Sequence, residues 1–328
     1  GVEYSHPDLL PYTKSYDAYK DIEYQGSSTI YKTNLYVDDN VNEKERAHGT
    51  CCAGIAGAQS NSSSLGGTIN TNTIGICGVA NSCMIASISL PISIADQASF
   101  ARGFAWASQN KIDVISCSWR CNTPSDIITE AIKQAATKGR NGKGCTIAFA
   151  TGNENLGQIS YPSSLDEVIS VGAIDMFGKR KIVGSRYEPK WGSNYGEGID
   201  VVAPGIRIST TDISGNGGLN SGSTVQKDAG LIDYQDNNYT KIFDGTSAAT
   251  PFVAGIAALI LERKPSLTSK EVKSIIQSTC TKLPDYFTST TSSSKTDGSW
   301  NLEVGYGLVN AYNAVAKAIM GNRQYVIT

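Results

Sequence analysis

The chain has 328 residues, of which 40% are hydrophobic and only 18% are charged, against roughly 25% charged in an ordinary soluble domain. This composition excludes an intrinsically disordered or acidic solvating chain, and the length suffices for two domains or one large one. With 28 Lys and Arg against 30 Asp and Glu, the formal net charge is −2, and no basic run is present. We therefore expect no nucleic-acid and no membrane partner.

The start of the chain and its cysteines bear on its location. The first residue is Gly1 rather than Met, which indicates processing upstream. The longest apolar stretch, 251–261, is too short to span a bilayer. Eight cysteines and loops rich in Ser, Thr, Asn and Gly favour a secreted protein with disulfide bonds. The candidates for bridges, whose pairing the spacing leaves open, are Cys77, Cys83, Cys117, Cys121 and Cys145.

Apolar runs alternate with helical patterns along most of the chain. The runs predict buried strands over 84–89, 113–118, 146–150, 168–173 and 199–203. The helical patterns predict helices over 95–109, 125–138, 246–262, 268–280 and 309–320. Ser125 is a plausible N-cap and Gly139 a stop for the second of these helices. The alternation predicts an α/β fold, with a mainly parallel sheet and helices on both faces.

Two segments interrupt this pattern. Residues 209–240 are rich in Gly, Ser, Asn and Asp, and residues 288–299 are nearly all Ser and Thr. Neither has enough apolar residues to form a domain, so both are predicted to be surface insertions. We therefore expect residues 1–328 to form a single domain.

A histidine and a serine each precede a run of small residues. The chain has only two histidines, and one of them, His48, precedes the small residues of 48–57, which we interpret as the start of a closely packed helix. Ser247 stands at the mouth of the expected helix 246–262, where unpaired N–H groups stabilise developing negative charge. Each has a structural alternative, because a lone histidine is often a satisfied polar group and serine is a common N-cap.

An asparagine completes the set. Asn153 follows the expected strand 146–150, at the carboxyl edge where parallel sheets build their sites. An amide at that edge can donate a hydrogen bond to an oxyanion.

In the order His, Asn, Ser, these segments resemble the subtilisin-like serine proteases, the subtilase family. The resemblance rests on His-Gly-Thr at 48–50 and on Gly-Thr-Ser-Ala-Ala-Thr-Pro at 245–251, and extends from Gly1 to about Ala318. It implies the subtilisin-like three-layer α/β fold and a serine endopeptidase. His48 would be the general base, Ser247 the nucleophile, and Asn153 with the Ser247 N–H the oxyanion hole. One oxyanion donor contributes about 3 to 4 kcal/mol to such a reaction.

The carboxylate of the catalytic triad has no counterpart in this match. Family members carry Asp-Ser/Thr-Gly shortly before His-Pro-Asp-Leu, which is residues 6–9 here. The match puts the motif's glycine on Gly1 and its aspartate two residues upstream, so we expect the first core strand to be lacking. Three explanations stay open: a separate chain left by cleavage, a segment missing from this sequence, or a degenerate relative. These explanations imply a partner, which is an N-terminal fragment or prodomain. It would supply this strand or inhibit the protein.

Residues 70–80 resemble the subtilase loop that surrounds a strong calcium site. An all-oxygen ligand set of this kind suits Ca²⁺, which would be structural. The alternative is an Asn-rich turn capped by Asp8. By the likeness the ligands are the carboxylate of Asp8, the side chain of Asn72, and the carbonyls of Asn70, Ile74 and Ile76.

Substrate is expected to pair in extended form with residues 116–120. The run Ser-Cys-Ser-Trp is similar to the kexin branch, which selects basic substrates with acidic residues shortly after the Trp. Arg120 follows here and would repel a basic side chain, and Trp119 is equally well a core residue. The candidate substrate-binding residues are Ser116, Ser118, Trp119, Arg120 and Gly152.

Two further functions and one thiol complete the predictions. A peptide ligase or macrocyclase would use the same acyl-enzyme but pass its acyl group to an amine, and a pseudoprotease would bind peptides without cleaving them.

Cys52 matches a cysteine that some subtilases carry beside the catalytic histidine, so we expect a buried free thiol there. Cys51 and Cys52 point about 100° apart on a helix and should not bond to each other.

Overall fold

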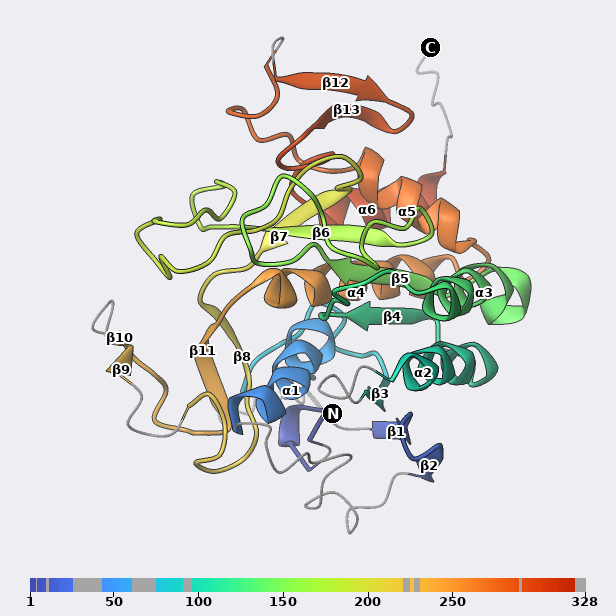
Figure 1. Cartoon of the computed structure of the whole chain (residues 1–328), viewed down its shortest axis with the longest axis vertical. Coiled ribbons are helices and arrows are strands. Elements are labelled where there is room, and N and C mark those ends of the chain that lie inside the picture. The colour runs from blue at the N-terminus through green and yellow to red at the C-terminus, as the bar shows by residue number, and fades with distance from the viewer. Residues whose placement is uncertain are drawn as a thin grey trace, which may run out of the picture.

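The computed structural model describes residues 1–3, 5–9, 12–25, 43–60, 75–90, 96–220, 225–226, 231–288 and 291–321. Its helices (Figure 1) are the short 3₁₀ helix η1 (Pro7–Leu9), α1 (Glu43–Gly57), α2 (Gln97–Gln109), α3 (Asp126–Gly142), α4 (Thr246–Arg263), α5 (Ser269–Ser278) and α6 (Ala311–Met320). Its strands are β1 (Tyr12–Asp17), β2 (Ile22–Gln25), β3 (Ile85–Ser89), β4 (Val114–Cys117), β5 (Thr146–Ala150), β6 (Ile169–Ile174), β7 (Val201–Pro204), β8 (Ile208–Thr211), β9 (Val225–Gln226), β10 (Leu231–Ile232), β11 (Tyr239–Phe243), β12 (Ser292–Lys295) and β13 (Gly298–Asn301).

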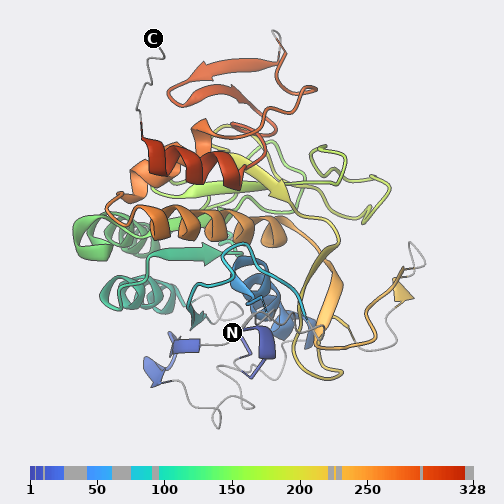
Figure 2. The same cartoon turned by 180° about the vertical axis from the view of Figure 1, so that it is seen from behind.

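The centre of the fold is a parallel sheet in the order β4-β5-β6-β7. A second sheet, in the order β2-β1-β3, pairs β1 with β3 in parallel and with β2 antiparallel. It lies beyond β4, at the blue end of the molecule in Figures 1 and 2. The remaining strands form the two-stranded ribbons β8-β11, β9-β10 and β12-β13.

Both faces of the central sheet are covered. Strand side chains alternate between faces, and in β5 this sends Phe149 and Ile147 into a core cluster with α2 and α3. The intervening Ala148 joins a second cluster with β6, β7 and the helices α4, α5 and α6. All five residues of β5 and all six of β6 are buried, as expected of parallel strands between two helical layers. The predicted α/β architecture with helices on both faces is confirmed.

The ends of the helices follow the sequence signals. Ser125 caps α3 by accepting a hydrogen bond from the N–H of Ile128, and Gly139 leaves the helical conformation, as predicted. Thr268 and Glu271 form a reciprocal capping box on α5. One prediction is wrong: α1 begins at Glu43, so His48 does not start its helix. The preceding residues Glu-Lys-Glu-Arg-Ala are strong helix formers and extend α1 toward the N-terminus.

The two expected insertions contain packed strands. The segment 209–240 begins in β8 and ends in β11, which pair with each other. Thr210 and Thr211 are buried, and their hydroxyls donate to the backbone carbonyls of Cys51 and Thr50 in α1. The segment 288–299 contains the β12-β13 hairpin. The ends of 209–240 are thus part of the core packing, while the single-domain division stays a prediction.

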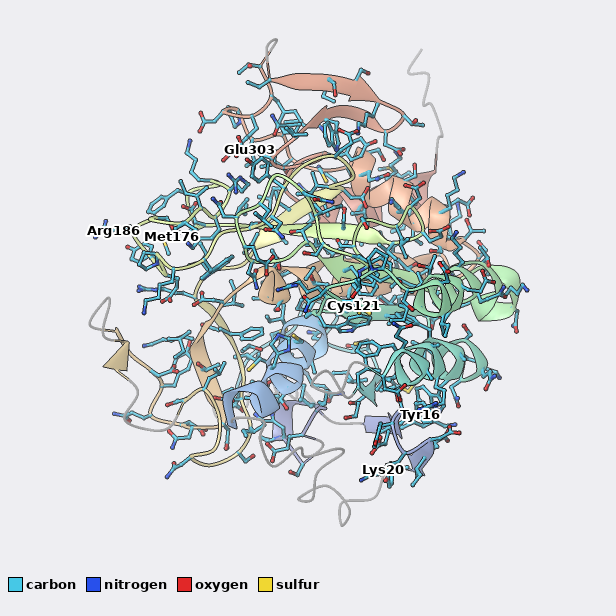
Figure 3. The ribbon with its side chains drawn as sticks, in the orientation of Figure 1. Tyr16, Lys20, Cys121, Met176, Arg186 and Glu303 are labelled. Atoms are coloured by element: carbon cyan, nitrogen blue, oxygen red, sulfur yellow. The ribbon has the colours of Figure 1, made fainter. Side chains whose placement is uncertain are left out.

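The predicted disulfide bonds are absent, because all eight cysteines are free thiols. Of the candidates, Cys117 and Cys145 are buried in the core cluster of α2 and α3, and Cys121 packs against the same cluster. The thiol of Cys145 donates to the carbonyl of Ile112 at 3.0 Å instead of bonding to another cysteine. Cys121, a further candidate, lies near the middle of the molecule in Figure 3. The prediction of export now rests on composition alone.

Within the described ranges, no helix is long and apolar enough to cross a membrane. The most apolar of them, α4, spans 18 residues but is buried in the core, where Ile260 and Val253 contact the central sheet cluster. The exposed large hydrophobic side chains include Met176, which lies near Arg186 at the periphery in Figure 3.

Candidate active site

The three expected catalytic residues come from three elements that meet. His48 lies on α1, Ser247 is the second residue of α4, and Asn153 follows β5. Helices α1 and α4 pack against each other, and α4 also packs against β5. The carboxyl ends of β4 and β5 lie side by side because the strands are parallel neighbours. The packing therefore gathers these side chains at one edge of the sheet.

The start of α4 leaves one N–H group available. Gly245 precedes the helix with φ of 110° and makes no side-chain cap, a conformation that favours glycine. The N–H of Thr246 donates to Asn153, and that of Ala248 to the carbonyl of Gly245. The N–H of Ser247 donates to no group among the described residues, at the end of the helix where the dipole is positive.

Two side chains support the carbonyl of Ser247. In a regular helix this oxygen would accept from the residue four positions later, which is Pro251 and has no N–H. The hydroxyl of Ser118 donates to it at 2.9 Å, and the thiol of Cys52 at 3.6 Å. In return, the Ser247 hydroxyl donates to the carbonyl of Ser118 at 3.3 Å. Ser118, the residue after β4, is thereby hydrogen-bonded to the first turn of α4.

The amide of Asn153 is oriented by its neighbour. Its Oδ1 accepts from both the N–H and the hydroxyl of Thr246, each at 2.9 Å. Because the N–H of Thr246 can only donate, the oxygen of the amide must face it, and Nδ2 is left as a free donor. No partner for Nδ2 is found among the described residues. Two unused donors, Nδ2 of Asn153 and N–H of Ser247, thus flank Thr246.

The loop after β5 holds Asn153 in place. Glu154 accepts from the N–H of Asn153 at 3.1 Å and from the side chain of Asn194 at 2.8 Å. Asn194 in turn accepts from the N–H groups of Glu154 and Leu156. Gly152 has φ of 105°, and a side chain on it would collide with Asn194. The sequence prediction included Gly152 but missed Asn194, which no local motif signals.

His48 has a different environment. Its Nδ1 lies 3.8 Å from the thiol of Cys52, and its ring stacks edge-on against Phe243 at 5.5 Å. No carboxylate among the described residues pairs with it. Burial, and secondarily the ammonium group of Gly1, lower the pKa of His48 to about 4. The imidazole is therefore neutral at pH 7, the form that accepts a proton.

Cys52 is a free thiol beside His48, as predicted, but it is half-buried rather than buried. Burial raises its pKa to about 12, so it stays protonated and contributes packing and a weak hydrogen bond rather than a thiolate. Cys51 on the same helix is free as well.

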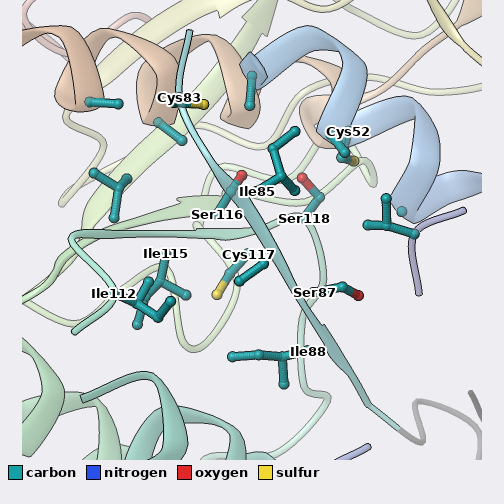
Figure 4. Close-up of a pocket in the computed structure, with 18 of the residues that line it drawn as sticks. Cys52, Cys83, Ile85, Ser87, Ile88, Ile112, Ile115, Ser116, Cys117 and Ser118 are labelled. Carbon is teal, nitrogen blue, oxygen red and sulfur yellow. The ribbon is translucent and has the colours of Figure 1, made fainter. Parts of the chain in front are cut away.

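The expected substrate-binding residues divide into two groups. Ser116, Ser118 and Arg120 line a cavity of about 2300 Å³, together with His48 and Asn153. Figure 4 shows it between β3 and the segment 112–118. Trp119 also borders it, but its ring packs on phenylalanines at 4.7 Å (Phe100) and 4.9 Å (Phe149). Its side chain thus belongs mainly to the core.

Arg120 is neutralised by a neighbour. Its Nε lies 3.0 Å from Oε1 of Glu154, with the two side chains 43% and 35% exposed. Since the other oxygen of Glu154 accepts from the N–H of Asn153, this ion pair connects the end of the expected substrate strand to the loop that holds Asn153.

Part of the expected calcium site is described. The carboxylate of Asp8 is fully buried and accepts from the N–H of Ile76 at 2.9 Å. A side chain on Gly75 would collide with that carboxylate, so the loop lies directly against it. Asn70, Asn72 and Ile74 are outside the described residues. Within the described part, no group of three His, Cys, Asp or Glu side chains could hold a metal ion.

Comparisons with known proteins place these features in a family. The model of the subtilase family matches residues 1–307. The "Calcium-dependent protease" of Nostoc sp. is 36% identical over 298 residues, 83% of this chain and 40% of that protein. "Subtilisin Savinase" of Lederbergia lenta is 30% identical over 266 residues, 80% of this chain and 76% of that protein. The chain thus spans less than half the length of the first of these relatives.

Solved structures show the same fold. The serine protease of Aeromonas sobria superposes with a TM-score of 0.72 at 17% identity, covering 100% of this chain and 60% of that chain. Fervidolysin of Fervidobacterium pennivorans, a keratinolytic enzyme related to subtilisin, gives 0.62 at 21% identity, with 96% and 41% covered. The fold is therefore subtilisin-like, and with the family match over residues 1–307 this chain belongs to the subtilase family.

Proposed function

We propose that this chain is the core of a serine endopeptidase that forms an acyl-enzyme on Ser247. The observation that carries the proposal is the pair of unused donors, the N–H of Ser247 and Nδ2 of Asn153, on either side of Thr246. Two fixed donors at a helix N-terminus suit the oxyanion of a tetrahedral intermediate, because they are oriented before the charge develops. The substrate class is protein or peptide.

The reaction assigns one role to each residue. The Ser247 hydroxyl turns from Ser118 toward His48, and its oxygen attacks the peptide carbonyl carbon while the imidazole accepts the proton. The carbonyl oxygen becomes an oxyanion between the two donors. As the C–N bond breaks, His48 returns the proton to the leaving amine, and water then hydrolyses the ester by the same exchange.

The role of His48 also requires a carboxylate. In serine proteases a carboxylate on the histidine fixes its tautomer and stabilises the imidazolium, and its loss lowers kcat about 10⁴-fold. We propose that this group is an aspartate supplied from outside the described residues. The described residues taken alone correspond to a weakly active enzyme.

A peptide-binding module without activity is the second candidate. The observation that favours it is the absence of a carboxylate partner for His48 among the described residues. A ligase or macrocyclase would use the same acyl-enzyme, and the mass of the product formed from a test peptide separates ligation from hydrolysis.

Labelling of Ser247 tests activation of the nucleophile. A fluorophosphonate probe should label the chain slowly, and the label should be lost in Ser247→Ala. The control is Ser164→Ala, at an exposed serine that does not line the cavity. Absence of label from the folded protein would instead support the binding module.

We also propose a structural Ca²⁺ at Asp8 and the loop 70–76. The buried carboxylate against this loop is an oxygen donor of the kind that Ca²⁺ prefers, and the relatives named calcium-dependent proteases support the idea. Removal of Ca²⁺ by a chelator should lower Tm, and re-addition should restore it. Asp8→Asn should abolish this response, and a Tm independent of Ca²⁺ would contradict the site.

A further inference from the structure

Arg180 is a buried cation that the proposed mechanism does not use. Its side chain is 8% exposed, and burial of a charge is costly unless the charge is paired and hydrogen-bonded. Its Nε donates to Oε2 of Glu303 at 2.7 Å, and its Nη1 donates at 2.9 Å to both Oδ1 of Asn155 and the carbonyl of Ser193. The guanidinium group also stacks over the ring of Tyr195 at 4.1 Å. Arg180 thus joins three segments that are far apart in the sequence.

Two of these segments, 153–155 and 192–195, pair with each other beside the proposed oxyanion donor. The carbonyl of Asn153 accepts from the N–H of Gly192 at 3.2 Å, and the carbonyl of Gly192 accepts from the N–H of Asn155 at 2.8 Å. A side chain on Gly192 would collide with that of Asn155, so the two segments are in direct contact. The main chain of Asn153 is therefore held by the second segment.

The guanidinium group of Arg180 lies at the junction of the two segments. Asn155 has φ of 60°, a left-handed conformation that asparagine adopts more readily than most residues. Its side-chain oxygen and the carbonyl of Ser193, one from each segment, accept from the same Nη1 atom. Without the guanidinium group both oxygens would lose this donor, and a buried acceptor left unpaired costs more than an ordinary hydrogen bond contributes. Loss of Arg180 should therefore loosen the contact between the segments.

The position of Nδ2 of Asn153 depends on this contact. The hydrogen bonds from Thr246 to Oδ1 orient the amide, but the place of the side chain also follows its main chain. An oxyanion donor must already lie at hydrogen-bond distance from the atom on which charge develops. A displacement of about 1 Å can lower the rate of a reaction by about 10²-fold.

We propose that Arg180 is a positioning residue for Asn153. It acts through Asn155 and Gly192, because its donors reach the paired segments and not the amide itself. Glu303, which follows β13 and is labelled in Figure 3, supplies the carboxylate partner of the guanidinium group. The effect on the reaction rests on the proposed function, whereas the contact between the two segments does not.

Arg140 provides a matched control in the same chain. Its side chain is 5% exposed, and its Nε lies 2.8 Å from Oδ1 of Asp113. Its other donors bind main-chain carbonyls, which belong to Gly144, Pro265 and Leu267. Both arginines are thus buried, ion-paired and bound to carbonyls, but only Arg180 contacts the loop of Asn153.

Amide hydrogen exchange, read by NMR, tests the structural part without any need for activity. Arg180→Met keeps an apolar stem but removes every donor. The N–H groups of Asn155 and Gly192 should exchange about tenfold faster in this variant, because the segments open more readily. In Arg140→Met these two groups should keep their rates, whereas the N–H of Ser269 at the start of α5 should exchange faster. Exchange of the β6 amides corrects each variant for global unfolding.

Two milder variants protect this test against a failure to fold. Arg180→Lys keeps one cationic donor, and Glu303→Gln changes a side chain that is 41% exposed. Each should speed exchange of the Asn155 and Gly192 N–H groups by about threefold. Unchanged exchange in all the folded variants, or equal acceleration by Arg140→Met, would overturn the proposal.

Labelling of Ser247 by the fluorophosphonate probe tests the effect on the reaction. The maximal labelling rate should fall about tenfold in Arg180→Met, less than the loss expected on removal of the donor. The probe concentration that gives half the maximal rate should change little, because an oxyanion donor acts mainly in the transition state. Arg180→Lys should recover part of the rate, and Arg140→Met should label normally.

The two measurements separate this proposal from the proposed function. Faster exchange in Arg180→Met, with no labelling of the unchanged protein, would uphold the hold of Arg180 on the two segments and overturn the endopeptidase proposal. A normal labelling rate in a folded Arg180→Met protein would uphold the endopeptidase and overturn the positioning role.

Discussion

The candidate site has a Ser247 side and a His48 side, and the two differ in how many contacts hold their side chains in place. On the Ser247 side, the first turn of α4 is held by hydrogen bonds to the side chains of Asn153, Ser118 and Cys52. On the His48 side, the imidazole contacts a thiol and an aromatic ring and borders a cavity of about 2300 Å³. The first turn of α4, with the two donors that we propose for the oxyanion, is thus held by several hydrogen bonds within the described residues, whereas His48 has fewer and weaker contacts there.

Core substitutions should reveal the largest difference between the two sides of the site, measured as the loss in free energy of unfolding. Ile260→Ala, at a fully buried residue of α4, should lower the free energy of unfolding by about 2 to 5 kcal/mol. Ile88→Ala, at a half-buried residue that borders the cavity, should cost about 1 kcal/mol, since less surface is buried there. Denaturant unfolding measures both. Equal losses would show that the two sides are packed alike.

Removal of the proposed oxyanion donor, Nδ2 of Asn153, should have the next largest effect, on the rate of fluorophosphonate labelling. Asn153→Asp keeps an oxygen for the Thr246 N–H but replaces the free donor with a second oxygen, so the rate of fluorophosphonate labelling should fall about 10² to 10³-fold. The fold should be intact by circular dichroism. Asn313→Asp, at an exposed residue of α6 away from the cavity, is the control and should change the rate little. An unchanged rate for Asn153→Asp would remove Asn153 from the oxyanion hole.

Asp244, which lies shortly before α4, should make the stability of the protein depend on pH. Burial raises the pKa of Asp244 to about 7, above that of an exposed aspartate near 4. The folded state therefore binds more protons than the unfolded state between these values, and stability falls as pH rises through this window. Asp244→Asn should stabilise the protein by about 1 to 2 kcal/mol at pH 8 and by much less at pH 4.

Thermal unfolding at the two pH values checks this prediction. Asn can still accept the hydrogen bond that the N–H of Arg207 gives to Asp244. Glu197→Gln, at an exposed carboxylate, is the control and should show no such pH dependence. A stabilisation by Asp244→Asn that is the same at both pH values would contradict the raised pKa.

The smallest expected effect concerns substrate charge. Arg120→Gln removes the partner of Glu154, and a partly exposed ion pair of this kind is worth at most about 1 kcal/mol. The ratio of cleavage rates for Lys-containing over Glu-containing peptides should rise about fivefold. Lys295→Gln breaks an ion pair with Glu197 far from the cavity and should leave the ratio unchanged. A constant ratio in Arg120→Gln would exclude Arg120 from selectivity.

Local sequence signals identified most of the central fold. The five apolar runs became β3 to β7, and Ser125 and Thr268 cap helices as their types suggest. These elements were predictable because capping and periodicity act over a few residues. The predictions missed β1, β2 and the start of α1, where polar residues such as Lys14 and Tyr16 obscure the strand pattern. They also placed disulfide bonds among cysteines that are free thiols in the structure.

The sequence by itself determined the family and the parallel α/β order, and it singled out His48, Asn153 and Ser247 as candidates, because these are properties of short motifs and of spacing. Only the tertiary structure decided which donors remain free, since this depends on Thr246 occupying the Asn153 oxygen and on Pro251 withholding an N–H from Ser247. It also revealed the space between β3 and β4. Two strand edges 25 residues or more apart in the chain face one cavity only after folding, and no local pattern records that relation.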